Sequence, residues 1–209
     1  MNTLIIAALL SSAFAATTRS EIRQSNAELS SNYSDIRDDN ADLHSLESII
    51  RNWERAYRHS AYGAERSADA AMDSWLRREI AESKREISEA RNEVRASKHE
   101  LNREVAEAHS ARGHRASQER AEARDDARDL QDDRRDLDVM EADLRQMQRI
   151  AGQLSAMQHK FDRRRASARD YQAKRSLLEQ LRSLSEREIR HNQVELQEDL
   201  AERSEARWD

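Results

Sequence analysis

Histidines are the side chains of this sequence best suited to bind metals or transfer protons, and they are scattered along it. The chain has seven of them, and no two stand at the i,i+4 spacing that places two imidazoles on one helix face. His109 and His114 are five residues apart, which turns their rings away from each other on a helix. We therefore expect exposed or ion-paired histidines and no histidine metal site.

Carboxylates are abundant, but their spacing does not fit a calcium loop. Residues 38–42 read Asp-Asp-Asn-Ala-Asp, yet the sixth and twelfth positions of such a loop would be Leu43 and Ile49, where an EF-hand needs Gly and Glu. The acidic run 125–138 could bind calcium only diffusely, because arginines interleave it. Carboxylate pairs also need a desolvated pocket before their pKa values separate enough for catalysis. We predict no metal ligands here.

The chain also lacks the groups on which other common chemistries depend. It contains no cysteine, which excludes thiol catalysis, disulfides and cysteine-bound zinc. No phosphate loop, nucleophile elbow or dinucleotide fingerprint occurs in it. The sequence therefore predicts a protein without catalytic residues or cofactor, and not an enzyme.

Composition predicts the elements that carry these side chains. The 209 residues include no Pro and three Gly, 37% are charged and 4% are aromatic. This composition is typical of long helices. Lys and Arg number 36 against 41 Asp and Glu, a net charge of −5, so the basic footprint of a nucleic-acid-binding protein is absent. We predict an all-α chain whose long helices form a coiled coil or an elongated antiparallel helical bundle.

Hydrophobic spacing divides the chain into segments. Large apolar residues recur every seven positions in 16–62, as in a coiled-coil helix, until Gly63 offers a helix end. The segment 64–111 predicts a second helix with a thin heptad seam. Residues 112–129 lack large apolar side chains and predict a charged hinge or a solvated helix, whereas 130–209 has the best heptads and predicts a C-terminal coiled-coil segment.

The heptads identify the positions through which helices of this chain would pack or self-associate. The predicted seam residues are Leu29, Ile36, Leu43, Ile50, Leu137, Met140, Leu144, Met147, Leu154 and Phe161.

Residues 1–15 differ from the rest and predict a signal peptide. An apolar run at 4–10 precedes Ala13 and Ala15, the small-x-small pattern of a cleavage site before Ala16. The run is far shorter than the roughly 20 residues that span a bilayer, so no stable membrane span is expected. These features predict a secreted protein or one of the secretory pathway or its granules, and a periplasmic one in a bacterium.

Two further features concern the compartment. The segment Ser-Ser-Ala-Phe-Ala at 11–15 resembles the bipartite plastid leaders of algae with complex plastids, which implies plastid targeting as a minor option. The sequon at Asn32 is a possible glycosylation site in a eukaryotic secretory pathway.

Three functions are compatible with these observations. The first is a non-catalytic structural coiled-coil protein of the secretory route, a matrix, filament or scaffold whose partner is itself or another coiled-coil protein. The second is an extracytoplasmic helical chaperone or adaptor that holds client proteins. The third, an amphipathic protein that binds lipid surfaces, is disfavoured because the apolar faces are narrow.

The heptad seam of 130–209 generates a first prediction. Replacing Met147 with Asp should lower the melting temperature markedly in circular dichroism, because an unpaired charge would be buried. The same replacement at Ala121, in the segment without large apolar residues, should change melting little. Equal effects of the two substitutions would contradict the predicted seam.

Overall fold

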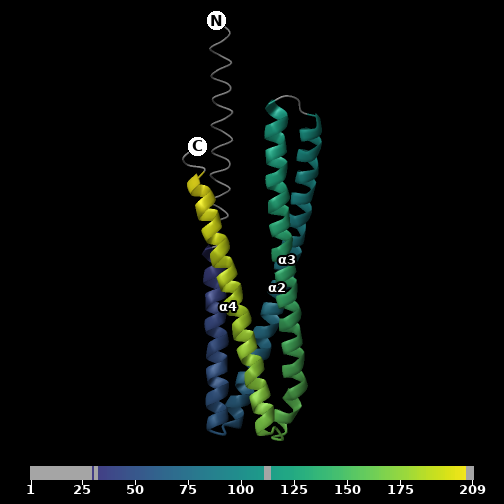
Figure 1. The fold of residues 1–209 in the computed structure, drawn as a ribbon. Helices are drawn as coiled ribbons and strands as arrows, with labels where there is room; N and C mark the ends of the chain where they lie inside the picture. Colours follow the sequence, from purple (N-terminus) through teal and green to yellow (C-terminus); the bar gives the residue numbers. More distant parts are fainter. Residues whose placement is uncertain (1–29, 31–32, 111–113, 206–209) are drawn as a thin grey trace. The chain divides into compact units, whose positions relative to one another are not determined.

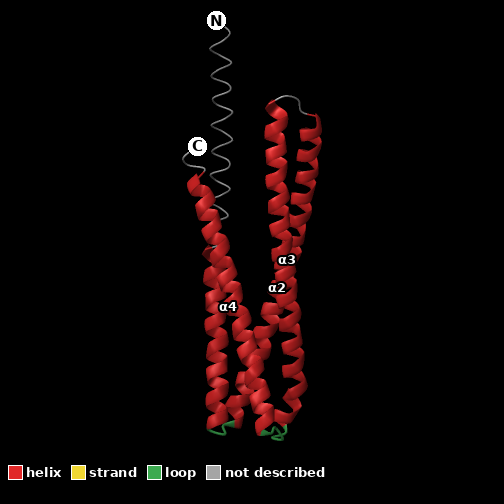
Figure 2. Ribbon diagram, viewed as in Figure 1, coloured by secondary structure: helices red, strands yellow, loops and turns green. Residues whose placement is uncertain are grey.

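The computed structural model describes residues 30, 33–110 and 114–205, and every segment of secondary structure in them is helical. A first helical segment covers 33–58 and is followed by α2 (Tyr62–Ser110), α3 (His114–Asp162) and α4 (Ala168–Glu205). Figure 1 shows the labelled helices, and Figure 2 shows short loops where helices join. The predicted all-α class is confirmed as a helical bundle. Leu29 and Asn32 lie outside the described residues.

Helices α2 and α3 form an antiparallel hairpin, and their contacts show the direction of pairing. Arg91 of α2 pairs with Glu141 of α3 at 2.7 Å, and the Ser97 hydroxyl donates to Asp133 at 2.9 Å. Residues farther along α2 thus meet residues earlier in α3. The heptads alone did not decide between a fold-back and an end-to-end arrangement, and for these two helices the structure shows the fold-back.

The chain divides into two compact units, one of which contains Asn52–Leu181. In the other, the first helical segment lies beside the second part of α4, where the Asn192 amide donates to Asp39 at 2.7 Å. Its buried apolar residues include Leu46, Leu184 and Ile189. No described helix is long and apolar enough to cross a membrane.

The unit 52–181 is packed unevenly along its length. At one end, which we call the four-helix end, it buries the largest side chains of the unit, among them Trp53, Trp75 and Phe161. Between residues 88 and 146 of the α2–α3 hairpin, the fully buried apolar side chains among those described are Ala108 and Leu130. A pair of helices has only one contact face, so little apolar area leaves water there.

The joints at the four-helix end are two helix caps of the same type. The Ala61 amide bonds to the Ala56 carbonyl at 2.9 Å and the Ser60 amide to the Tyr57 carbonyl at 3.1 Å, which is the Schellman pattern. The end of α3 repeats it around Arg164. Ser60 and Arg164 have φ angles of 51° and 54°, the left-handed conformation that this cap requires.

From the sequence we expected the first of these helix ends at a glycine. Gly63, the expected helix end, instead lies in the first turn of α2, and the helix break occupies residues 59–61. Ser60 takes the left-handed position, three residues before the glycine. Gly152 lies within α3.

Candidate functional site: a buried ion pair at the four-helix end

A buried ion pair joins α2 to α4. The ammonium group of Lys174 donates a hydrogen bond to Asp69 Oδ1, and each side chain is only 6% exposed. Burying a carboxylate and an ammonium group costs several kcal/mol per ion, so such a pair persists only with close geometry and further partners. Desolvation raises the pKa of Asp69, although the Lys174 charge opposes that shift.

Aromatic rings supply the further partners of Lys174. Its Nζ lies 5.0 Å from the ring centroid of Trp53 and 4.3 Å from that of Phe161. The faces of such rings attract cations, and more strongly when water is excluded. Trp53 comes from the first helical segment and Phe161 from α3, so the ammonium group contacts one residue from each other helix of this end.

Tyr171 connects this ion pair to the rest of the aromatic cluster. Its ring stacks on Tyr57 with centroids 3.9 Å apart and meets Phe161 edge-on at 4.9 Å. Its hydroxyl donates to Glu65 Oε2 at 3.3 Å. Burial, followed by the nearby Glu65 charge, raises the pKa of Tyr171 to about 12. Tyr171 therefore remains a hydrogen-bond donor at any physiological pH.

Glu65 is an incompletely satisfied member of the cluster, as is Trp53, whose buried Nε1 has no hydrogen-bond partner among the described residues. Glu65 is buried, and its Oε1 has no hydrogen-bond partner among the described residues. Desolvation raises the pKa of Glu65, while the Tyr171 hydroxyl and the Lys174 charge act in the opposite direction. The ionised form thus costs the fold some stability.

The start of α4 is held by a capping box. The Ser167 amide donates to Asp170 Oδ2 at 2.9 Å, and the Asp170 amide donates to the Ser167 hydroxyl at 3.3 Å. Lys160 pairs with the same carboxyl group at 2.6 Å. The bonds from Lys160 and then Ser167 hold the pKa of Asp170 far below its usual value. This box positions the turn of α4 that carries Tyr171 and Lys174.

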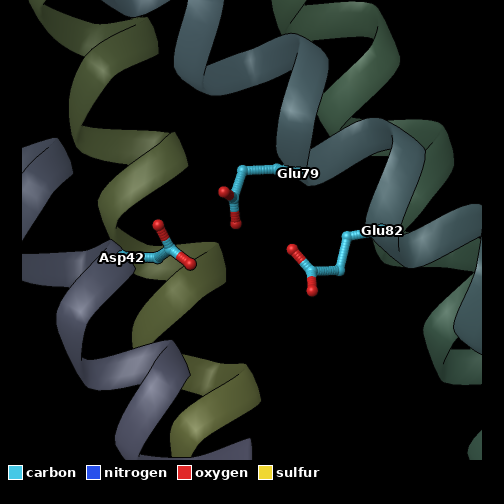
Figure 3. Close-up of side chains that lie close together, drawn as sticks. All are labelled: Asp42, Glu79 and Glu82. Carbon is cyan, nitrogen blue, oxygen red and sulfur yellow. The ribbon is translucent and has the colours of Figure 1, made fainter.

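Carboxylates also gather elsewhere in the unit. Ligand atoms of Glu104, Glu119 and Glu122 lie within 4.8 Å of one another, but Arg103 contacts Glu104 at 3.2 Å and supplies positive charge. Glu79 and Glu82 both project from α2 in Figure 3, where Asp42 of the other unit is also labelled. We assign no metal site to these groups.

The described seam residues fall into two groups. Four of them are fully buried, and these are Ile50, Met147, Leu154 and Phe161. Five are only half-buried, and these are Ile36, Leu43, Leu137, Met140 and Leu144. The half-buried residues on α3 lie in the hairpin, where only two helices meet. Of the predicted seam residues, Phe161 alone joins the aromatic cluster.

Sequence reasoning missed the charged members of the cluster. It did not single out Lys174, Glu65 or Asp69. A signal was present, because Lys174 precedes Leu177, Leu178 and Leu181 at the i+3, i+4 and i+7 spacing of a seam position. A charged residue within an apolar stripe is the pattern that identifies a buried ion.

Comparison with known proteins adds no further constraint. The chain matches no known protein family, no curated protein and no solved structure.

The ion pair generates a second prediction. Lys174→Met should lower the free energy of unfolding by about 3–5 kcal/mol, because Asp69 would remain buried and charged without its partner. The double variant Lys174→Met with Asp69→Leu should recover most of that loss in urea unfolding. Lys160→Met is the matched control, and it should have a much smaller effect because the Lys160 side chain is 44% exposed. A double variant no more stable than Lys174→Met would contradict the assignment.

Glu65 generates a third prediction, which concerns pH. Its raised pKa means that the folded state holds the proton more tightly than the unfolded state does, so stability falls as pH rises above the ordinary value of 4.5. Glu65→Gln should therefore melt at a higher temperature than the wild type at pH 7. Thermal unfolding should show this advantage shrinking as pH falls towards 4.5. An advantage independent of pH would mean that packing, and not ionisation, causes it.

Proposed function

We propose that this chain is a non-catalytic structural protein that self-associates through its α2–α3 hairpin. The observation that carries the proposal is the hairpin seam, which two helices leave half-exposed over a great length. Leu137, Met140 and Leu144 of α3 remain half-buried although they occupy heptad positions. Helices with such seams are stabilised when further helices cover the remaining apolar surface.

The α2 side of the hairpin supports the same proposal. Val94, Leu101 and Val105 follow one face at the i, i+7 and i+11 spacing of a helical stripe. Val94 and Leu101 are half-buried, and Val105 is 39% exposed. A second copy of the chain carries the same narrow stripes and can cover them in a larger bundle.

The four-helix end gives the hairpin a stable base. Its aromatic cluster and buried ion pair join all four helices, so the hairpin extends from a well-packed end of the unit. A stable end with a thin, incompletely buried arm suits a subunit of a matrix, filament or scaffold. Clients of a chaperone would contact the same apolar stripes, which makes that role the alternative.

The proposed compartment is the secretory pathway or the extracellular space. It rests on the leader-like sequence of residues 1–15, with cleavage before Ala16. These residues and the sequon at Asn32 lie outside the described residues.

The fourth prediction tests self-association. The chain beginning at Ala16 should increase in mass with concentration in size exclusion with light scattering. Val105→Glu should shift the protein towards smaller species, because it places a charge in the exposed stripe. Ala96→Glu, at an exposed position on the opposite face of α2, is the matched control and should behave as the wild type.

A wild-type protein that remains monomeric at the highest concentration would contradict the proposed function. A monomer that also suppresses the aggregation of unfolded client proteins would instead support the chaperone alternative.

A further inference from the structure

Charge is distributed unevenly along α3 and the turn that follows it. Residues 119–143 contain eleven Asp or Glu and five Arg, whereas residues 144–170 contain seven Arg or Lys and two Asp. The nearly balanced net charge of the whole chain does not show this uneven distribution. The hairpin part of α3 is therefore acidic, whereas the rest of α3 and the turn after it are basic.

The basic charges gather where the two joints of the four-helix end meet. Tyr62 donates to the Asp162 carbonyl at 2.5 Å, and the Arg164 guanidinium lies 4.6 Å from the Tyr62 ring centroid. These contacts place the 59–61 turn beside the 163–167 turn, and both loops appear at the same end in Figure 2. We call the exposed arginines around these turns the basic tip, which consists of Arg55, Arg58, Arg163, Arg164, Arg165 and Arg169.

The basic tip is ordered and lacks local neutralisation. Its turn lies between the Schellman cap at Arg164 and the capping box of α4, so its backbone is held at both sides. Of the nearby carboxylates, Glu54 pairs with Arg175, Asp170 pairs with Lys160, and Asp162 accepts a hydrogen bond from the Gln158 amide at 3.5 Å. Arg163, Arg165 and Arg169 form no ion pair with any described residue.

Helix α3 carries an exposed acidic face, opposite in charge to the basic tip. Asp125, Asp129 and Asp132 succeed one another at helical spacing and are all exposed. Asp125 and Asp132 pair with arginines of their own helix, whereas no ion pair is formed by Asp129 among the described residues. Partial burial and then repulsion from Asp125 and Asp133 raise the pKa of Asp129. Additional positive charge would therefore stabilise this face.

The two surfaces of one chain cannot meet. Asp129 and the end of α3 at Asp162 belong to the same continuous helix, and 33 residues at 1.5 Å each separate them by about 50 Å. The basic tip therefore cannot contact the acidic face of its own chain. A second copy of this chain supplies both complements, and two copies aligned antiparallel along α3 satisfy both contacts at once.

We propose that the basic tip of one copy binds the acidic face of α3, centred on Asp129, of a second copy. This inference rests on the proposed self-association and names a surface for it. Complementary charge gives such a contact its orientation and its partner choice, and it makes the contact sensitive to salt. Antiparallel pairing of the hairpins also places the apolar stripes of the two copies side by side.

A charge-swap experiment tests the proposal on the chain beginning at Ala16. The tip variant carries Arg163→Glu and Arg165→Glu, and the face variant carries Asp129→Lys and Asp132→Lys. Each variant alone should associate at least about tenfold more weakly than the wild type in sedimentation equilibrium. An equimolar mixture should associate again, because the reversed tip then meets the reversed face. Arg149→Glu with Lys84→Glu, two exposed positions of the same unit that belong to neither surface, is the matched control.

The outcomes separate this proposal from the proposed function. A wild type that associates while both variants behave like it overturns the charge contact and leaves self-association standing, and a monomeric wild type overturns both. If both variants associate more weakly but their mixture does not recover, the charge contact is also overturned. It is overturned as well if salt does not change the association of the wild type. Circular dichroism shows whether each variant is still folded, so that weaker association is not mistaken for unfolding. If the tip variant self-associates like the wild type but no longer binds an anionic polysaccharide, the tip binds a different partner and the proposal is overturned.

Discussion

A shortage of large apolar side chains constrains everything else in this chain. Helices that each carry one narrow apolar stripe bury a core only where several of them meet. At the four-helix end, Trp53, Trp75 and Phe161 are removed from water together. Between residues 88 and 146 of the α2–α3 hairpin only two stripes face each other, and Ala108 and Leu130 are the apolar side chains fully buried there among those described. Stability is therefore concentrated at one end of the unit.

The ion pair of Lys174 and Asp69 belongs to that stable end, and its energetics explain why it is enclosed by rings. A buried pair adds little net stability compared with apolar residues of similar size, but losing one partner is costly. Trp53 and Phe161 lower the cost of the ammonium group, and Tyr171 donates to the neighbouring Glu65. Because each helix supplies one partner, we interpret the cluster as a specificity device that selects one alignment of the four helices.

Charged residues are also distributed unevenly outside the core. The total of −5 is close to balance, yet acidic residues gather on the hairpin part of α3 and arginines around the two turns at its other end. A chain with narrow apolar seams gains little specificity from hydrophobic contact alone, because such stripes are similar along their length. In the self-association that we propose, separated charges distinguish one alignment of two copies from its alternatives.

Much of the fold could be predicted from the sequence, for reasons visible in particular residues. The absence of Pro and the heptads ending at Phe161 were sufficient for the all-α bundle, since period and composition act locally. The helix break was misplaced at Gly63 because a Schellman cap can accept Ser60 when the rest of the motif is satisfied. The cluster around Lys174 was missed because Asp69, its charged partner, lies 105 residues away in the sequence. No local pattern reports such a contact.

Hydrogen exchange at two protein concentrations tests the central claim most directly, which is that a second copy covers the thin hairpin. The account predicts that amides of residues 80–110 and 114–145 exchange more slowly in concentrated than in dilute solution. Amides of the four-helix end around Trp75 and Leu178 should already be protected in both, since they are buried within one chain. Identical exchange of the hairpin at the two concentrations would contradict the account.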